Sequence, residues 1–207
     1  IKAITTAKGG MATTNNKDLF EKLKFVRSHG ITRDKKKFIL KNKNNLHYEQ
    51  QTIGYNFRMT DFQAALGNNQ LKRLKKFIRI RNKIANLYIK KLSNLPIKFQ
   101  KYKKNKIIHA YHIFVIRFEN FNLRNSFYDY MLKNKIKCSF HYPSIYSQPY
   151  YKKKFKQSKC KEMEKYEEDA ITLPIFPNLK LVEQEKIIKF VIQFFKKNDF
   201  KYSKENN

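Results

Sequence analysis

The chain opens with IKAITTAKGG, in which a lysine at position 2 stands shortly before Thr5-Thr6 and Gly9-Gly10. A lysine amine attacks carbonyl carbons and forms Schiff bases, so one well-placed lysine can carry covalent catalysis. The chain holds 38 lysines, however, and composition does not set Lys2 apart from the others. The residues alone leave two interpretations open: one surface charge among many, or a nucleophile that precedes a turn of small residues.

Further polar side chains stand in the segment GYNFRM. Asn56 carries a neutral amide that can donate hydrogen bonds to phosphate oxygens, although Gly54-Tyr55-Asn56 can equally be only the turn before a helix. Arg58 has a planar fork that binds an external anion or pairs with a carboxylate of the protein itself. Both alternatives stay open for each residue.

A third group follows a predicted short strand: His141, Tyr142, Pro143 and Ser144. Loops at strand ends are good places to present polar groups. Cys138 and His141, which are separated by two residues, point to opposite faces of that strand, and this argues against a shared metal ion. Two cysteines in a chain of this length make no disulfide framework, so a reducing cytoplasm is the expected compartment.

Two other histidines have plainer explanations. His112 shares one side of a predicted strand with Phe114 and Ile116, which favours a satisfied core histidine over a substrate contact. His29 lies at a predicted helix end, where a charge on the helix dipole explains it as well as a functional role does.

The elements that position these residues are predicted from turns, caps and periodicity. The glycine pair within ITTAKGGMATT predicts a hairpin, or a turn between strands, over residues 4–14. A helix over residues 17–28 is capped by Asn16. Residues 32–45 are polar and basic with little periodicity, so we expect a loop there.

The strongest helix signal is the capping box Thr60-Asp61-Phe62-Gln63. Behind it, apolar residues recur at close to helical spacing as far as Pro96. A helix this long, with at most one break, is suited to bridging two domains, and we expect the boundary near residue 80.

The remainder of the chain is predicted to form a small α/β layer. The expected strands cover residues 110–118, 137–142 and 171–173, and the expected helices cover residues 123–134, a lysine-rich stretch up to Asp169, and residues 182–195. The residues after Asn198 are expected to be disordered.

The formal net charge of +30 suggests a partner such as nucleic acid or an anionic surface. Eight arginines accompany the 38 lysines, which are scattered from end to end beside abundant Asn and Ile. Base and phosphate readers depend on arginine's fork, so we interpret the charge as mostly a solvated surface, with a basic binding module as the rival. No run of 18 apolar residues and no signal peptide stands in the sequence, so a soluble protein is expected.

Six segments, in chain order, resemble the C-terminal half of the DegT/DnrJ/EryC1/StrS family of nucleotide-sugar aminotransferases: IKAITTAKGG, RSHGITRD, EQQTIGYNFRMTDFQAALGNNQLKRL, AYHIFVIRF, FHYPSIYSQPYY and ITLPIFPNL. The resemblance implies an α/β, fold-type-I enzyme dependent on pyridoxal 5′-phosphate. It also implies three parts: residues 1–80 from the large cofactor domain, a small domain over residues 81–197, and a tail over residues 198–207.

The resemblance assigns roles to the candidate residues. It implies that Lys2 forms the Schiff base with the cofactor, and that Asn56 reaches the cofactor phosphate or the substrate of a neighbouring subunit, so that a homodimer shares its active sites. The resemblance implies that the loop 141–144 lies against the nucleotide-sugar. Arg58 stays a candidate substrate contact, with pairing to a carboxylate of the protein as the alternative. The sequence departs from the family's commoner spelling at Pro143 and Ser144.

Within the family, RSHGITRD and YNFRMTDFQAALG resemble most the branch that aminates C4 of a UDP-linked 4-keto-6-deoxy-N-acetylhexosamine in pseudaminic acid biosynthesis, with L-glutamate as the donor. A related dehydratase branch has histidine in place of the lysine, so lysine at position 2 argues against that chemistry. The family normally has about as much chain again before this point. The resemblance therefore implies half an enzyme, inactive by itself, with a decayed gene product as a further alternative.

Overall fold

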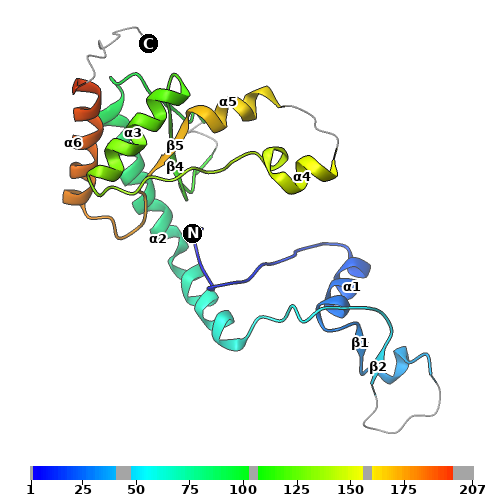
Figure 1. Cartoon of the computed structure of the whole chain (residues 1–207). Helices are drawn as coiled ribbons and strands as arrows, with labels where there is room; N and C mark the ends of the chain where they lie inside the picture. The colour runs from blue at the N-terminus through cyan, green and yellow to red at the C-terminus, as the bar shows by residue number, and fades with distance from the viewer. Residues whose placement is uncertain (1, 41–47, 103–106, 156–159, 198–207) are drawn as a thin grey trace. The chain divides into compact units, whose positions relative to one another are not determined.

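The computed structural model describes residues 2–40, 48–102, 107–155 and 160–197. The fold is mixed α/β, as expected, and it divides into two compact units (Figure 1). Unit 1 comprises Ile1–Ala3 and Arg73–Asn207, and unit 2 comprises Ile4–Lys72. The domain limits expected from the sequence remain a prediction, and residues 198–207 lie outside the described part of the chain.

Unit 2 is built around α1 (Lys17–Arg27), which begins where its cap predicts. The Asn16 side chain accepts a hydrogen bond from the N–H of Leu19 at 2.9 Å, which satisfies one of the free donors of the first turn. Gly30, at a φ of 65°, ends the helix and donates its N–H to the carbonyl of Phe25. The helix prediction over residues 17–28 is therefore confirmed to within one residue.

Two short elements follow α1 in unit 2. β1 (Ile31–Thr32) pairs antiparallel with β2 (Glu49–Gln50), and the 3-10 turn η1 (Lys35–Lys37) lies between them. The expected loop over residues 32–45 thus contains one 3-10 turn, and residues 41–47 lie outside the described residues. The buried carboxylate of Glu49 accepts the N–H groups of Ile39 and Leu40 at 2.7 and 2.9 Å, which ties this loop to β2.

Of the hairpin, or turn between strands, expected over residues 4–14, the turn is present but the strands are not. The Thr6 hydroxyl donates to the carbonyl of Lys8 at 2.8 Å, and Ala7 donates its N–H to the Thr5 hydroxyl at 3.1 Å. Threonine side chains that bond to neighbouring backbone in this way compete with the ladder of a strand.

The turn packs on the start of α2 (Asp61–Leu92), which is one uninterrupted helix of 32 residues. Gln63 Nε2 donates to the carbonyl of Lys8 at 3.2 Å, and a Cβ at Gly67 would approach Thr6 Cγ2 to 2.9 Å. The capping box is formed in both directions, because Thr60 N–H donates to Gln63 Oε1 at 3.2 Å and Gln63 N–H donates to Thr60 Oγ1 at 3.3 Å.

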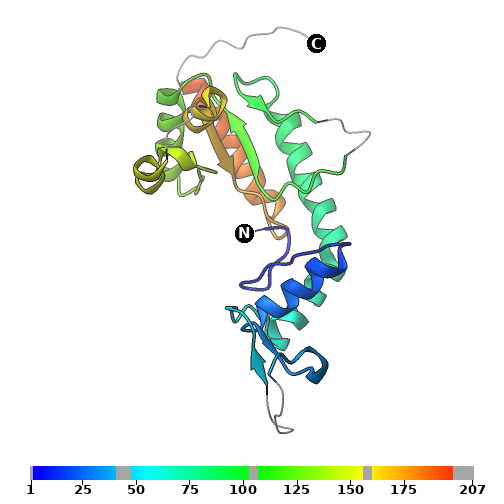
Figure 2. The same ribbon diagram turned by 90° about the vertical axis from the view of Figure 1, so that its right-hand side faces the viewer.

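Unit 1 contains an antiparallel sheet in the order β3-β4-β5 (Figure 2). Its strands are β3 (Lys98–Phe99), β4 (Phe114–Arg117) and β5 (Ala170–Leu173), and Ile116 is paired with Ile171. The strand expected over residues 110–118 begins only at Phe114, since Tyr111 has a φ of 41° that no strand accommodates.

The strand expected over residues 137–142 is reduced to a single bridge between Ser139 and Thr172. Beyond it, Pro143 has no N–H to continue a ladder. The next N–H, that of Ser144, donates to the Glu167 carboxylate at 3.0 Å and turns the chain away from the sheet.

Further helices of unit 1 are α3 (Phe121–Lys133), α4 (Pro149–Lys154), α5 (Lys161–Asp169) and α6 (Leu181–Lys197). The 3-10 turn η2 (Ile145–Ser147) precedes α4 and contacts it. α3 contacts α5, α6 and β5, and both views show α3 running beside α6. The helices expected over residues 123–134 and 182–195 are confirmed.

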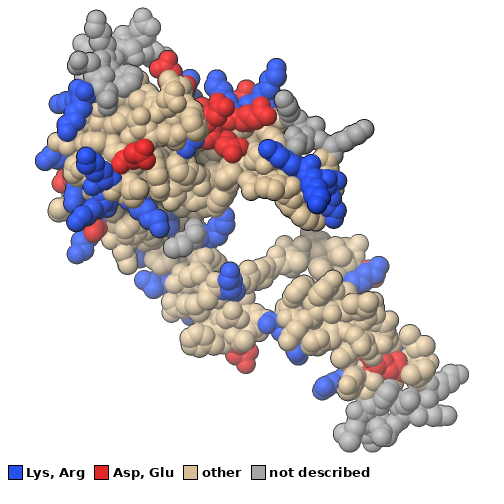
Figure 3. All heavy atoms as spheres, in the orientation of Figure 1, with Lys and Arg blue, Asp and Glu red and all other residues tan. Residues whose placement is uncertain are grey.

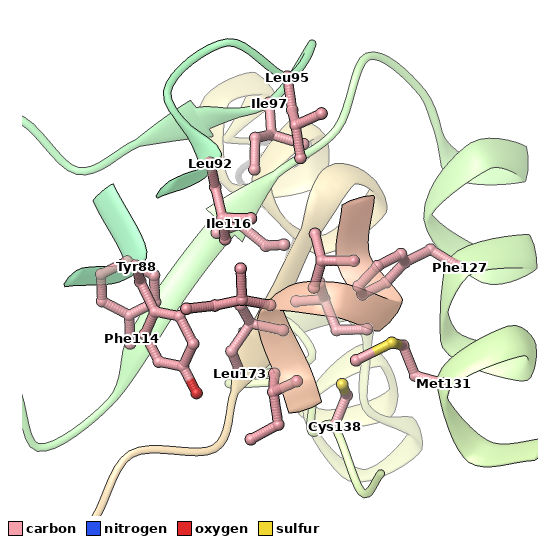
Figure 4. Close-up of a cluster of buried hydrophobic side chains, with 14 of the residues drawn as sticks. Tyr88, Leu92, Leu95, Ile97, Phe114, Ile116, Phe127, Met131, Cys138 and Leu173 are labelled. Atoms are coloured by element: carbon pink, nitrogen blue, oxygen red, sulfur yellow. The ribbon is translucent and has the colours of Figure 1, made fainter. Parts of the chain in front are cut away.

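The hydrophobic core lies entirely in unit 1 as far as the described residues go. Side chains from α2, β4, β5 and α3 converge there, among them Tyr88, Ile116, Leu173 and Phe127 (Figure 4). By contrast, no hydrophobic side chain in the described part of unit 2 is buried.

Uncharged surface makes up most of the face shown in Figure 3, with charged side chains scattered across it. Basic groups are spread over it, and acidic groups gather over α5, whose sequence KEMEKYEED is rich in glutamate. In the described ranges, no helix has both the length and the apolar character that a membrane span requires.

Candidate functional site

Lys2 belongs to unit 1 and is exposed. Two histidines of the same unit lie within its electrostatic reach. Burial lowers the pKa of His112, and the positive charges of Lys2 and Arg81 lower it further. Burial also lowers the pKa of His141, again with a contribution from Lys2. Lys2 therefore lies close enough to both imidazoles for its charge to disfavour their protonated forms.

The backbone around His112 is held by a buried arginine of α2. Arg81 is 3 % exposed, and its Nη1 donates to the carbonyls of Tyr111, His112 and Ile175 at 3.0, 3.3 and 2.9 Å. The two segments that it joins lead into β4 and out of β5. Arg81 thus fixes the position of His112 through the main chain.

The loop 141–144 presents its residues differently. His141 is half-buried, and its Nδ1 lies 2.8 Å from the hydroxyl of Thr172. Tyr142 and Pro143 are exposed, whereas Ser144 is only 2 % exposed and its hydroxyl has no partner among the described residues. Tyr142 and Pro143 are therefore the residues of this loop that are most open to a ligand.

A hollow of about 200 Å³ opens beside this loop. Its lining consists of Arg124, Phe140, His141, Tyr142, Pro143, Tyr166, Glu167 and Ala170. Sequence reasoning missed Arg124, Tyr166 and Glu167, because nothing local in the sequence links α3 and α5 to residues 140–143. A larger hollow of about 410 Å³, between α2 and α6, contains none of the predicted site residues.

Arg124 is the most constrained of the missed residues. Its Nε and Nη2 donate to the carbonyls of Glu168 and Glu167 at 2.9 and 3.1 Å, and its guanidinium lies 4.5 Å from the ring centre of Phe140. Burial lowers its pKa, although nearby carboxylates oppose that effect. Arg124 therefore joins the end of α5 to the floor of the hollow.

Unit 2 contains the second group of candidates. Arg58 Nε donates to Asn56 Oδ1 at 3.0 Å, and Arg58 Nη2 lies 3.4 Å from His29 Nε2. The segments RSHG and GYNFRM meet here, since His29 N–H donates to the carbonyl of Tyr55 at 2.9 Å. The sequence left His29 open between a helix-end charge and a functional role, and the contact with Arg58 depends on this pairing of distant segments.

Two glycines allow the close approach of these segments. A Cβ at Gly54 would lie 2.2 Å from the backbone nitrogen of Gly30, and a Cβ at Gly30 would lie 2.1 Å from the carbonyl oxygen of Thr52. No other residue fits at either position without a backbone shift, so the glycines hold His29 against the GYNFRM segment.

The predicted site residues thus fall into two groups. Lys2 and residues 141–144 lie in unit 1, and Asn56 and Arg58 lie in unit 2. Across the described ranges no three His, Cys, Asp or Glu side chains gather as a metal site. Cys138 is buried, and burial raises the pKa of its thiol to about 12, so this thiol is a poor ligand and a poor nucleophile.

Comparison with known proteins gives a consistent result over nearly the whole chain. The model of the DegT/DnrJ/EryC1/StrS aminotransferase family matches residues 1–192. An uncharacterized protein of Methanocaldococcus jannaschii is 34 % identical over 183 residues, which are 86 % of this chain and 47 % of that protein. The UDP-4-amino-4,6-dideoxy-N-acetyl-β-L-altrosamine transaminase of Campylobacter jejuni is 31 % identical over 195 residues, or 92 % of this chain and 48 % of the transaminase.

A solved structure gives the same result. Helicobacter pylori PseC, an aminotransferase involved in the biosynthesis of pseudoaminic acid, superposes with a TM-score of 0.82 at 30 % identity. The superposition covers 95 % of this chain and 51 % of the PseC chain. The chain spans about half the length of the curated relatives it matches.

Proposed function

The chain belongs to the DegT/DnrJ/EryC1/StrS aminotransferase family, and we propose that it forms part of a pyridoxal-phosphate enzyme that transfers an amino group to a nucleotide-linked sugar. The observation that carries the proposal is the environment of Lys2. The lysine of the IKAITTAKGG segment lies within electrostatic reach of His112 and His141, whose pKa values are lowered by burial and by nearby positive charge.

The residues present fit the cofactor. Pyridoxal 5′-phosphate needs an amine for its aldehyde and hydrogen-bond donors for its phosphate. Lys2 is an exposed primary amine, and Asn56 and Arg58 are exposed donors. When bound, the cofactor supplies an electron sink that makes the carbon–hydrogen bond beside the transferred nitrogen acidic.

The roles of the chain's own groups follow from their chemistry. In its neutral form the Lys2 amine would act as the base that moves the proton of the substrate carbon bearing the transferred nitrogen. Transamination requires such a base from the protein. His141, whose Nδ1 lies against the Thr172 hydroxyl, is held in one orientation and can bind a sugar hydroxyl through its other nitrogen. His112 is fixed by the Arg81 contact with its carbonyl and can hold a proton near Lys2.

The substrate that we propose is a UDP-linked 4-keto-6-deoxy-N-acetylhexosamine, aminated at C4 with L-glutamate as the donor, in pseudaminic acid biosynthesis. Support comes from the transaminase of Campylobacter jejuni, whose name gives a UDP-linked 4-amino-4,6-dideoxy sugar. The exposed Tyr142 and Pro143, at the rim of the hollow in unit 1, are suited to contact the sugar. The compartment that we propose is the cytoplasm, in line with the cysteine usage.

A homodimer with shared active sites is part of the proposal. Its support is the surface of unit 2, where apolar side chains are exposed and none is buried among the described residues. The exposed side chains include Leu19, Phe20, Tyr55, Phe57 and Phe62. A surface with so much apolar area is typical of one that another protein surface covers.

The test is a Lys2→Arg variant of the whole protein that contains this chain, with Lys8→Arg as the matched control from the same segment. Amino-sugar formation from the UDP-4-keto sugar and L-glutamate is followed by mass spectrometry, and borohydride reduction is used to locate the cofactor on a lysine. We expect Lys2→Arg to lose at least a thousandfold in rate and the borohydride label, and Lys8→Arg to keep both. Transamination that survives Lys2→Arg would refute the proposal.

A further inference from the structure

Arg58 contacts two polar side chains of unit 2. Its Nε donates to Asn56 Oδ1 at 3.0 Å, and its Nη2 faces His29 Nε2 at 3.4 Å. Among the described residues no carboxylate forms an ion pair with Arg58. The guanidinium therefore has a defined position and an uncompensated positive charge.

The donor-only chemistry of arginine determines how its two partners are oriented. A guanidinium nitrogen never accepts, so the atom of Asn56 that faces it must be the amide oxygen, and the amide NH₂ then points elsewhere. For the same reason the facing nitrogen of His29 must be unprotonated, which leaves the ring proton on Nδ1. The described chain contains no hydrogen-bond partner for Asn56 Nδ2 or Arg58 Nη1.

The backbone at His29 is held on both sides of the residue. His29 has a φ of 64°, in the left-handed region that non-glycine residues rarely adopt. Its N–H donates to the carbonyl of Tyr55, and its carbonyl accepts a hydrogen bond from Gln50 Nε2 at 3.0 Å. A histidine that only completed the helix dipole of α1 would not need the contact with Arg58.

We propose that His29 is a positioning residue, which together with Asn56 holds the Arg58 guanidinium so that the free donors of Arg58 and Asn56 bind a phosphate or diphosphate group. The identity of that group in the cell rests on the proposed function. The positioning itself does not, because it follows from contacts within unit 2.

The test uses the chain labelled with ¹⁵N in arginine and histidine. Each of the eight arginines gives one Nε–Hε signal, and Arg58→Lys identifies that of Arg58. We expect the neutral His29 ring to carry its proton on Nδ1. We also expect inorganic pyrophosphate to shift the Arg58 signal in a saturable way, while the exposed Arg33 shifts less. If the neutral His29 ring instead carried its proton on Nε2, the proposal would be wrong. This measurement needs no variant of His29.

Two variants of similar size separate positioning from packing. His29→Gln keeps an acceptor near the place of Nε2, whereas His29→Phe keeps the ring and loses the acceptor, and neither is β-branched at the positive φ. We expect His29→Gln to bind pyrophosphate within about twofold of the wild type, and His29→Phe to bind it roughly fivefold more weakly, the upper range for an exposed charged contact.

Several outcomes would contradict the proposal. They are wild-type affinity in His29→Phe, equal losses in both variants, and absence of pyrophosphate binding by the wild type. The transamination assay on Lys2 is independent of this experiment. If the whole protein transaminates and His29→Phe binds pyrophosphate as tightly as the wild type, only the positioning role is refuted. A fivefold loss in His29→Phe without transamination would refute only the proposed enzyme.

Discussion

Arg81 offers the sharpest test of how the fold positions the site. Its Nη1 donates to three carbonyls within unit 1, and no carboxylate pairs with it among the described residues. Replacing Arg81 by Met keeps the volume and removes a buried charge, but it leaves the carbonyls of Tyr111, His112 and Ile175 without this donor. Each such loss costs about 1–3 kcal/mol, and relief from the buried charge offsets part of it. We expect a net loss of roughly 3 kcal/mol in the unfolding free energy of unit 1.

The measurement is urea unfolding followed by circular dichroism, with Arg79→Met as the matched control, because Arg79 is exposed on the same helix. A second readout is the pKa of His112, which the charge of Arg81 lowers. Removing that charge must raise this pKa, and histidine NMR titration detects the change. If Arg81→Met were as stable as Arg79→Met, with an unchanged His112 titration, the positioning argument would fail.

Three further predictions concern stability and charge. Burial lowers the pKa values of three histidines of unit 1, so their neutral form stabilises the fold above the unfolded pKa of about 6.5, and this stability is lost as the pH falls. We therefore expect lower urea midpoints at about pH 5 than at about pH 7.5, and equal midpoints would contradict this prediction. The histidines are His109, His112 and His141. The carboxylate of Asp169, which is 4 % exposed, accepts hydrogen bonds from Nε and Nη2 of Arg117 at 2.6 and 2.7 Å. Asp169→Asn should therefore lower the urea midpoint by an amount equivalent to about 2–3 kcal/mol, whereas Glu168→Gln, at an exposed position, should leave it unchanged. Duplex DNA should bind weakly and equally to wild type and Lys2→Ala at physiological salt, whereas tight, steeply salt-dependent binding in a filter assay would favour the basic-module rival.

The predictions that succeeded concern interactions between residues only a few positions apart in the sequence. The Asn16 cap and the Thr60–Gln63 capping box join residues three apart, so their types and spacing are enough to place the starts of α1 and α2. The long amphipathic period likewise predicted α2 and α6, because a helix repeats the same local bond along its length.

The predictions that failed depend on distant partners. Residues 137–142 have strand-like composition, yet only Ser139 finds a partner, since Glu167 of α5 binds the N–H of Ser144 and turns the chain away. Over residues 4–14 the threonine hydroxyls bond within the turn, and the described residues place no strand opposite them. Composition predicts that a segment can form a strand, but pairing decides whether it does.

The same division holds for the candidate site. The sequence by itself determined the starts and periods of the main helices, the family resemblance and the identity of Lys2, Asn56 and Arg58 as candidates. Only the tertiary structure brought His112 and His141 near Lys2, Arg124 and Glu167 to the hollow, and His29 to Arg58. The physical reason is that a helix cap is a bond between near neighbours in the chain, whereas a site is made of contacts between residues as far apart as Arg81 and Ile175, and folding alone sets those distances.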